Sequence, residues 1–578
     1  MGADHPRQHR IAAEPVFACR YPREPGSCAG VTRATTIGRV TIRDLARERL
    51  GFEQLRPGQE QAVAAAAAGR DVLAVMPTGG GKSAIYELAG LLRDGPTVVV
   101  SPLIALQDDQ LAHLRAAGLP ATVLNSAQSG GARAAALVEA CGPDEFVFVS
   151  PEQLSNDETR AALLRARPGL FVVDEAHLIS QWGQDFRPDY LRLGAQADEF
   201  GVGVRIALTA TAAPPVRREI CRRLGLRDPE EVIGDLDRPH IELSVQHARS
   251  PHDKQRLVGQ AAGELGGSGI VYAATHAGAE AARDTLVSAG ERATLYHAGL
   301  GAGARRQAMA EFLDGSARIV AATVAFGMGV DKPDVRWVLH ADVPVSLDAY
   351  YQELGRAGRD GERAEARLLY RSEDIGAARH LTAHGVSETA VTEAAQGLAA
   401  AGVAQPGSRS ATLALARLVD VGAAAWAADG QVRWTGAMDI GAALAAAREE
   451  AEREREVERS RLEMMRRYAE HGGCRRSFLL SYFGQDYPGP CGTCDNDRQS
   501  APARPVVEPF PVGSRVAGDR WGEGTVQRYD GDQVTVLFDQ HGYRDLLVPL
   551  VLERGLLRTA PRRSDDGTRG PKERSNDA

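Results

Sequence analysis

The chain has 578 residues, a net charge of −8 and an apolar fraction of 43%, so it is too long for one hydrophobic core and about three to five folded units are expected. No stretch reaches the roughly 18 consecutive apolar residues of a membrane span, the polar N-terminus lacks a signal-peptide core, and seven cysteines in so long a chain fit a reducing cytoplasm better than a disulfide scaffold. The acidic balance argues weakly against a nucleic-acid partner, although a groove can be locally basic on an acidic protein.

The N-terminal half predicts an α/β unit after a short extension. Residues 1–40 are rich in Pro, Arg and Gly without periodicity, so we expect disorder there, or a start codon placed too early. From 41 to 237, apolar runs alternate with stretches of helical pattern, which predicts a parallel sheet with helices on both faces. The expected strands are 72–75, 97–100, 146–150, 170–173 and 204–208.

A Gly-rich segment follows the first of these strands and precedes a helical stretch. In such a loop, backbone N–H groups and the helix N-terminus face phosphate oxygens. Lys82 would reach the β- and γ-phosphates of a nucleotide, and Ser83 would bind Mg²⁺. The usual pattern begins with Gly where this chain has Met76, and an ordinary Gly-rich turn is the alternative. The other loop residues are Thr78, Gly79, Gly80 and Gly81.

An acidic pair, Asp174 and Glu175, follows the apolar run 170–173 and is part of the segment Asp-Glu-Ala-His. Asp174 would hold Mg²⁺ directly or through water, and Glu175 would orient and polarise the attacking water. Acids after a strand are common on protein surfaces. Together with the Gly-rich loop, however, this pair predicts hydrolysis of a nucleoside triphosphate.

A second α/β block extends from 238 to 371 and has no phosphate loop of its own, so we expect a nucleotide in the cleft between two lobes. Its expected strands are 269–272, 293–296, 318–321 and 337–340. The segment 352–360 would complete the catalytic site with Gln352, Arg356 and Arg359. The two arginines lie three apart, on one face if helical, and could stabilise transition-state charge. A solvated Arg-rich helix start is the alternative.

These motifs together resemble superfamily 2 helicases, and within them the RecQ family of DNA helicases, from about residue 50 to 497. The most discriminating segment, Ser180-Gln-Trp-Gly-Gln-Asp-Phe-Arg-Pro-Asp-Tyr190, looks like the family's aromatic-rich loop, which couples single-stranded DNA to hydrolysis. The loop usually has His where this chain has Gln184. The segment 273–276, Ala-Ala-Thr-His, departs from the family's usual Cys-Asn-Ser-Arg.

The resemblance implies two RecA-like lobes and further residue roles. Gln59 would read adenine, with Arg56 and Phe52 against the base, and Asp331 would also contact the nucleotide. Trp182 and Phe186 would stack on DNA bases, although core aromatics are the alternative. The other residues implied in DNA binding or coupling are Ser101, Arg187, Thr209, Thr211, His297 and Thr323.

Three cysteines near the end of the resemblance have zinc-ligand spacing: Cys474, then the pair Cys491 and Cys494. By resemblance to the RecQ zinc module, which has four Cys, the fourth ligand here would be Asp497, whose oxygen is an acceptable donor. A helical run over 450–471 leads into the first ligand, and the module would extend over 450–500. A degenerate module held by packing alone is the alternative.

Between lobe and zinc module, residues 372–449 form an insert. Two Ala-rich helical patterns, 387–401 and 410–421, precede a hairpin signal at Asp429-Gly430. A winged helix and a purely helical spacer both fit. Because no winged helix is evident after the zinc module, we expect an exposed aromatic of this hairpin, Trp426 or Trp434, to separate the DNA strands.

The C-terminal region begins with a Pro-rich linker at 501–511. Short strand patterns with Gly turns over 512–560 resemble the small SH3-like or Tudor-like barrel of UvrD-type helicases, a candidate surface for a protein partner. The tail 561–578 is polar, and disorder is expected.

The sequence therefore predicts an ATP-dependent DNA helicase of RecQ type that uses ATP, Mg²⁺ and Zn²⁺ and acts on single-stranded and forked DNA. By resemblance it would move 3′ to 5′ and serve recombination or repair in the cytoplasm, at the nucleoid if bacterial. The alternatives are a DNA-stimulated translocase that does not unwind duplex, an RNA helicase, and a non-enzymatic scaffold.

Overall fold

The computed structural model describes residues 40–560 and the strand β1 (Val16–Phe17), except for residues 78, 103, 126–127, 129, 143–144, 181–186, 328–331, 383–385, 428, 488 and 499–507. The chain divides into two compact units, Met1–Gln499 and Ser500–Ala578. Strand β1 pairs antiparallel with β2 (Val40–Thr41), so the expectation of disorder over 1–40 does not hold for these short segments.

The first lobe is built on a seven-stranded sheet, ordered β5-β6-β4-β7-β8-β3-β9, in which every pair is parallel. Buried apolar runs form its centre, as predicted, because a parallel sheet is covered on both faces. The strands are β3 (Val72–Val75), β4 (Thr97–Val100), β5 (Ala121–Leu124), β6 (Phe146–Val149), β7 (Leu170–Val173), β8 (Val204–Thr209) and β9 (Glu230–Ile233).

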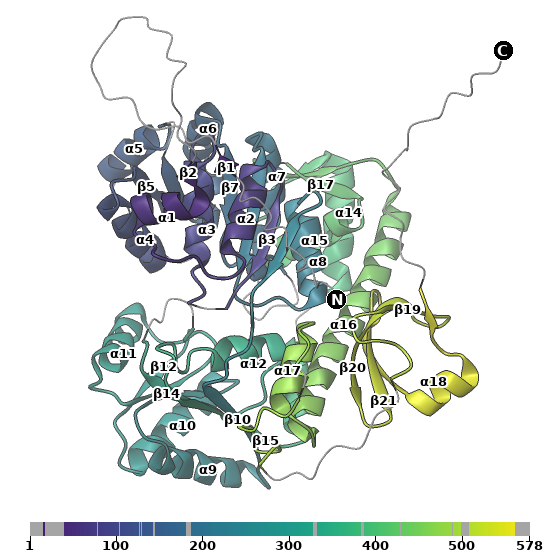
Figure 1. Cartoon of the computed structure of the whole chain (residues 1–578). Coiled ribbons are helices and arrows are strands. Elements are labelled where there is room, and N and C mark those ends of the chain that lie inside the picture. The colour runs from purple at the N-terminus through teal and green to yellow at the C-terminus, as the bar shows by residue number, and fades with distance from the viewer. Residues whose placement is uncertain are drawn as a thin grey trace, which may run out of the picture. The chain divides into compact units, whose positions relative to one another are not determined.

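Helices flank the sheet of this lobe (Figure 1). Local signals fix several of their starts: Thr41 and Asp44 form a capping box at the first helix, and the Asn156 side chain caps the sixth. The helices are α1 (Ile42–Leu50), α2 (Gln59–Ala67), α3 (Lys82–Leu91), α4 (Ile104–Ala116), α5 (Gly130–Glu139), α6 (Asp157–Ala166), α7 (Leu193–Glu199) and α8 (Pro214–Leu224), with 3₁₀ turns η1 (Pro151–Ser155), η2 (Ala176–Ile179) and η3 (Pro188–Arg192).

The second lobe has a six-stranded parallel sheet, ordered β10-β15-β14-β11-β13-β12. Gly269 faces Trp337 across one strand pair, and a Cβ at Gly269 would lie 2.0 Å from the indole ring, so only glycine fits. The strands are β10 (Ile241–His247), β11 (Ser268–Tyr272), β12 (Ala293–Tyr296), β13 (Ile319–Ala322), β14 (Val335–His340) and β15 (Ala364–Tyr370), and the helices are α9 (Pro251–Glu264), α10 (His276–Ser288), α11 (Ala302–Asp314), α12 (Leu347–Leu354) and α13 (Asp374–Thr382).

The insert after this lobe contains a three-stranded antiparallel sheet, ordered β16-β18-β17. The order of helix, strand, helix and hairpin favours the winged helix over the purely helical spacer. Its core includes Leu398, Leu418 and Val432. The elements are α14 (Glu388–Ala401), β16 (Val403–Ala404), α15 (Arg409–Asp420), β17 (Ala424–Trp426) and β18 (Val432–Trp434).

A long helix, α16 (Ile440–Glu470), connects the insert to the zinc-ligand region and is followed by α17 (Arg475–Tyr482). The helix predicted over 450–471 thus begins at Ile440, and its first turns contribute Ala443 and Ala447 to the core of the insert. The expected boundary at 449/450 therefore falls inside a helix, because the Ala-rich start of α16 carries no local signal for a break.

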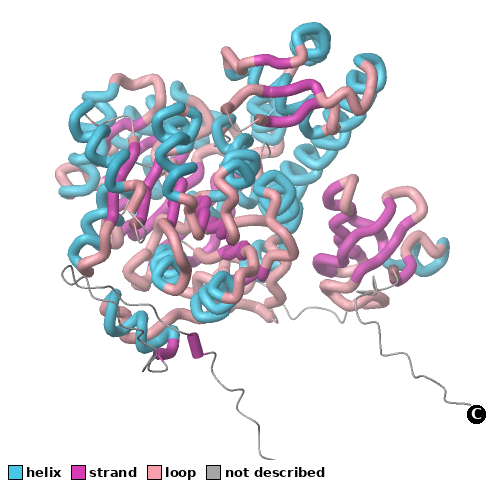
Figure 2. Tube along the Cα trace, turned by 90° about the horizontal axis from the view of Figure 1, so that it is seen from above, coloured by secondary structure: helices cyan, strands magenta, loops and turns pink. Residues whose placement is uncertain are grey.

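The second unit, taken by itself, is a five-stranded antiparallel sheet, ordered β22-β21-β20-β19-β23. Figure 2 shows its magenta strands grouped together with the cyan helix of this unit. That helix was not predicted. The elements are β19 (Arg515–Gly518), β20 (Gly522–Asp530), β21 (Gln533–Phe538), β22 (Gly542–Leu547), α18 (Val548–Arg554) and β23 (Arg558–Thr559). Among the residues described in both units, no helix combines the length and apolar character needed to cross a membrane.

Candidate nucleotide, nucleic-acid and zinc sites

The Gly-rich loop joins β3 to α3, and its backbone requires glycine at two positions. Gly79 and Gly81 have φ values of 77° and 73°, in the left-handed region. Gly81 caps α3, so Lys82 is the first residue of that helix and Ser83 the second. The helix therefore directs its N-terminal N–H groups toward the loop, where a phosphate group would bind. Thr78 lies outside the described residues.

The predicted adenine-reading residues contact the phosphate loop. The Gln59 side chain, only 3% exposed, donates from Nε2 to the Gly81 carbonyl at 2.7 Å and accepts from the Arg56 N–H at 2.6 Å. The Arg56 guanidinium donates to the Gly79 carbonyl. Gln59 thus links the end of the loop to α2. To bind an adenine base, its side chain would have to break these hydrogen bonds and form new ones with the base.

Phe52 stacks on His113, with ring centroids 6.1 Å apart. His113 lies on α4 and was not singled out from the sequence. A lone histidine on a helix has no sequence pattern that marks it as functional. It also lies far from Phe52 in the chain, so the sequence does not indicate that the two rings meet. The structure alone therefore identifies this aromatic pair beside the predicted adenine motif.

The acidic pair follows β7, which lies next to β8 in the sheet. The Glu175 N–H donates to the Asp174 carboxylate at 2.9 Å, and Glu175 has a φ of 49°, a left-handed conformation that costs energy for a residue with a side chain. Burial, together with the charge of Glu175, raises the pKa of Asp174 to about 7, although the charge of Lys82 opposes this rise. A half-buried acidic pair opposite a lysine is a donor set that fits Mg²⁺, since a divalent cation would offset its charge.

His177 connects the acidic segment to the end of β8. Its Nδ1 lies 3.0 Å from the Thr209 hydroxyl and 3.3 Å from the Glu175 carboxylate. The Thr209 hydroxyl in turn donates to the Thr211 carbonyl at 2.9 Å. Thr209 and Thr211 are therefore buried next to the hydrolysis residues rather than on an open DNA-binding surface.

The second lobe reaches this position through α12. Gln352 donates from Nε2 to the Thr211 hydroxyl at 2.6 Å, which joins the two lobes directly. Arg356 follows the end of the helix and donates to the Gly327 carbonyl, so the two arginines lie in a turn and the helical alternative for them is wrong. A cavity between the lobes is lined by His177, Thr211, Gln352 and Arg356, among others. Arg359 lies in the same turn.

The other expected DNA-contacting residues vary in accessibility. Ser101, His297 and Thr323 are buried, at 3%, 4% and 6% exposure. Neither ring nitrogen of His297 has a hydrogen-bond partner among the described residues, although Nε2 lies 3.3 Å from Glu280. Arg187 donates to the Pro102 carbonyl at 3.3 Å. The expected base-stacking residues, Trp182 and Phe186, and the nucleotide contact Asp331 lie outside the described residues.

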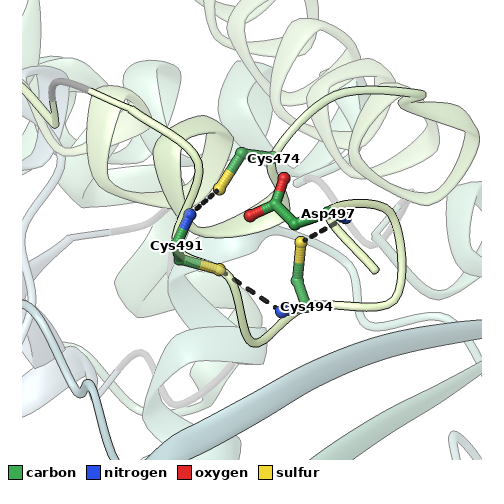
Figure 3. Close-up of side chains that lie close together, drawn as sticks. All are labelled: Cys474, Cys491, Cys494 and Asp497. Carbon is green, nitrogen blue, oxygen red and sulfur yellow. Dashed lines mark hydrogen bonds between the residues drawn. The ribbon is translucent and has the colours of Figure 1, made fainter. Parts of the chain in front are cut away.

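The four predicted zinc ligands converge. The ligand atoms of Cys474, Cys491, Cys494 and Asp497 all lie within 4.8 Å of one another, and their side chains point toward a common centre (Figure 3). Backbone N–H groups support the sulfurs: Cys491 donates to Cys474 at 3.3 Å, and Cys494 donates to Cys491 at 3.3 Å. Three sulfurs and one carboxylate, stabilised as anions by such donors, fit a tetrahedral zinc ion.

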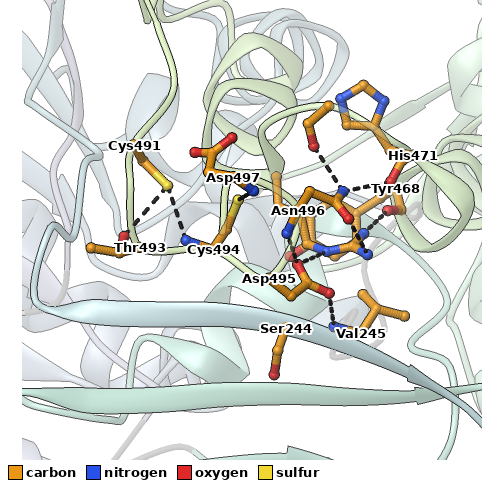
Figure 4. Close-up of polar contacts among 12 residues, drawn as sticks. Ser244, Val245, Tyr468, His471, Cys491, Thr493, Cys494, Asp495, Asn496 and Asp497 are labelled. Carbon is orange, nitrogen blue, oxygen red and sulfur yellow. Dashed lines mark hydrogen bonds and ion pairs between the residues drawn. The ribbon is translucent and has the colours of Figure 1, made fainter. Parts of the chain in front are cut away.

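Residues next to the ligands attach this zinc module to the second lobe. Asp495 donates its N–H to the Leu243 carbonyl at 3.1 Å and accepts from the Val245 N–H at 2.9 Å, along the edge strand β10 (Figure 4). The Asn496 side chain donates to the carbonyls of His471 and Gly473, at 2.6 and 2.8 Å. The ligand loop is therefore fixed by polar contacts on both sides.

Comparison with known proteins gives three family matches. The DEAD/DEAH box helicase family matches residues 56–219, the helicase conserved C-terminal domain matches 253–361, and the RecQ zinc-binding family matches 436–498. The chain resembles the RecQ family in all three regions. These matches support the two lobes and the zinc module of the predicted RecQ resemblance, whereas none of the three covers the second unit.

Curated relatives agree with this family. The ATP-dependent DNA helicase RecQ of Haemophilus influenzae is 32% identical over 460 residues, which are 79% of this chain and 64% of that protein. The RecQ helicase of Pasteurella multocida is 33% identical over 456 residues, 79% of this chain and 62% of that protein. The chain spans just under two thirds of the length of these RecQ relatives. The solved helicase Lhr of Mycobacterium smegmatis, bound to ssDNA and AMP-PNP, is 19% identical, with a TM-score of 0.48 over 80% of this chain and 66% of that one.

The hairpin expected to separate the DNA strands packs against the first lobe. Neither Trp426 nor Trp434 is exposed. The Trp426 ring lies 5.4 Å from the Arg192 guanidinium of η3 and packs near Leu191, while Asp420 pairs with Arg223 at 3.1 Å. Trp426 is therefore half-buried against lobe 1, and Trp434 is half-buried against the core of the insert, which argues against the expected exposed aromatic wedge.

Proposed function

We propose that this chain is an ATP-driven DNA helicase of RecQ type that moves 3′ to 5′ along single-stranded DNA and unwinds duplex DNA in recombination or repair. The observation that carries the proposal is the direct link between lobes, from Gln352 through Thr211 to His177 and the acidic pair. Through a contact of this kind, a nucleotide bound to one lobe can change the position of the other lobe. The RecQ-type zinc module distinguishes the chain from helicases in general.

The residues divide the chemistry as follows. Lys82 and the loop N–H groups would bind the phosphates, and Ser83 and Asp174 would hold Mg²⁺, which supplies charge neutralisation when bound. Glu175 would orient the attacking water and accept its proton. Arg356 and Arg359 would stabilise negative charge that develops on the transferred phosphoryl group.

A second candidate function is a DNA-stimulated translocase that does not unwind duplex. A specific observation favours it: the only hairpin of the insert is packed on lobe 1 in the described part of the chain, with Trp426 against Arg192. The RNA-helicase alternative has less support. The chain matches the RecQ zinc-binding family, and the relative from Haemophilus influenzae is named a DNA helicase.

An unwinding assay distinguishes these functions. Forked, 3′-tailed, 5′-tailed and blunt DNA duplexes are compared with RNA duplexes of the same sequence, and ATP turnover is measured in parallel with single-stranded DNA. We expect unwinding of the forked and 3′-tailed DNA only. ATP turnover with single-stranded DNA but no unwinding of any duplex would favour the translocase, and unwinding of RNA would contradict the proposal.

The proposal extends to protein partners and to the cellular location. The C-terminal unit, for which a UvrD-type barrel was expected, is the candidate surface for a protein partner. We propose a cytoplasmic location, at the nucleoid if the source is bacterial, where its DNA substrates would be found.

A further inference from the structure

Asp348 lies on α12 at a junction of three parts of the first unit. Its Oδ2 accepts from the Arg461 guanidinium at 2.6 Å and from the Tyr482 hydroxyl at 2.5 Å. Its Oδ1 accepts from the backbone N–H of Ala213 at 3.3 Å. Arg461 belongs to the long helix α16, Tyr482 to α17 and Ala213 to lobe 1, so one carboxylate of lobe 2 contacts both lobe 1 and the zinc module.

The junction is buried and charged. The Arg461 side chain is 4% exposed, and that of Asp348 is 12% exposed. Burial alone would raise the pKa of Asp348, but the charge of Arg461 and the hydrogen bonds from Arg461, Tyr482 and Ala213 lower it below its usual value. The carboxylate is therefore ionised at neutral pH, and each charge depends on the other for its compensation.

The junction adjoins the hydrolysis residues. Asp348 and Gln352 are one helical turn apart on α12 and therefore share a face. Gln352 holds the Thr211 hydroxyl, and Asp348 holds the N–H of Ala213, two residues further along the same segment of lobe 1. Asp348, Gln352 and Arg461 all line the interlobe cavity that also contains His177 and Arg356.

Other contacts hold the zinc module in a fixed position around this junction. The Arg217 guanidinium of lobe 1 donates to the Phe483 carbonyl at 3.2 Å, and Arg476 donates to the Ile241 carbonyl of lobe 2 at 2.7 Å. Gln485 accepts from the Leu236 N–H, between the lobes, at 2.9 Å. The position of Arg461 is thus set by contacts that span both lobes.

We propose that Asp348 is a positioning residue for ATP hydrolysis, through which Arg461 of the zinc module holds α12 against lobe 1 so that Gln352 and Arg356 face the nucleotide. This rests on the proposed ATP-driven function. It gives the zinc module an effect on the hydrolysis step itself, beyond the stability of its own fold.

The test compares Asp348→Asn, Arg461→Met and Arg461→Lys in the full chain, with Arg466→Met as a matched control on the exposed side of α16. Zinc content, melting temperature, and kcat and KM for ATP with saturating single-stranded DNA are measured for each. We expect zinc content and KM to stay unchanged. The Asn and Met variants should lose about 10- to 100-fold in kcat, since a displacement of about 1 Å can cost about 100-fold. The Lys variant, which keeps the charge, should lose less.

The Tyr482→Phe variant keeps the proposal testable if a variant at the ion pair fails to fold, because it removes a single hydroxyl. We expect a kcat loss of about two- to tenfold, the rate equivalent of one hydrogen bond. Unchanged kcat in folded, zinc-loaded variants would overturn the proposal. So would a kcat loss that merely follows loss of zinc or of folded protein. If the unmodified chain fails to hydrolyse ATP with DNA, the proposed function itself is contradicted, and the positioning role of Asp348, which rests on it, is contradicted with it.

Discussion

Lys82 and Glu175 have distinct roles in the proposed hydrolysis site, so their variants should fail in different ways. On this proposal, Lys82→Ala removes the cation that would face the phosphates, and Glu175→Gln removes the base that would orient water. We expect DNA-stimulated ATP turnover to fall by about 100-fold or more in each. The Glu175 variant should still bind ATP, because the loop contacts remain.

Steady-state turnover with single-stranded DNA and equilibrium titration with a fluorescent ATP analogue measure the two effects. Glu158→Gln, an exposed acid on lobe 1, serves as the control for a neutralised carboxylate. Normal turnover in either site variant would contradict the assignment of the hydrolysis residues.

Gly269 offers a prediction about packing. A Cβ there would overlap the Trp337 ring, so Gly269→Ala should destabilise the protein by about 1–3 kcal/mol, a usual cost of overpacking a core. Gly263→Ala on α9 is the matched control, because a Cβ at Gly263 meets no atom within 4 Å. Urea unfolding of both variants gives the comparison, and equal midpoints would show that lobe 2 adjusts without cost.

At the scale of the elements, we predict that the zinc module binds one metal ion and depends on it for stability. Freshly purified protein should carry about one zinc ion per chain. Cys491→Ser should lose the metal and lower the melting temperature, whereas Asp497→Cys should retain it, since a thiolate is the softer ligand. Cys141→Ser, at an exposed cysteine outside the cluster, should change neither. Metal analysis that finds no zinc in unchelated protein would refute the site.

The hairpin of the insert should behave as a packing element. Trp426→Ala removes contacts with Leu191 and Arg192, and the expected loss of stability is about 1–3 kcal/mol, below the cost for a fully buried Trp. Unwinding and ATP turnover should then fall by the same factor. Arg433→Ala, exposed on the same hairpin, controls for surface effects. A selective loss of unwinding in the Trp426 variant would restore the strand-separating role that the packing argues against.

At the scale of the whole molecule, the first unit should bind zinc and hydrolyse ATP without the second unit. All the proposed hydrolysis residues and zinc ligands lie within Met1–Gln499. A chain ending at Gln499 should therefore keep its zinc and its DNA-stimulated ATP turnover, which metal analysis and steady-state kinetics would measure side by side with the full chain. A large loss of turnover in a folded, zinc-loaded truncation would show that the C-terminal unit takes part in hydrolysis.

The sequence by itself determined the two lobes, because their central strands are continuous apolar runs and the loop before α3 has a distinctive Gly-rich pattern. It also indicated the three cysteine ligands of zinc by their spacing, and the resemblance added Asp497. The strands β5, β9, β10 and β15 escaped prediction, and three of them, β9, β10 and β15, carry polar residues among the apolar ones and so have no continuous apolar run. Only the tertiary structure decided the burial of Trp426, the attachment of Gln59 to the phosphate loop, and the junction at Asp348. These contacts join residues far apart in the chain, and buried hydrogen bonds and ion pairs between distant segments leave no local pattern in the sequence.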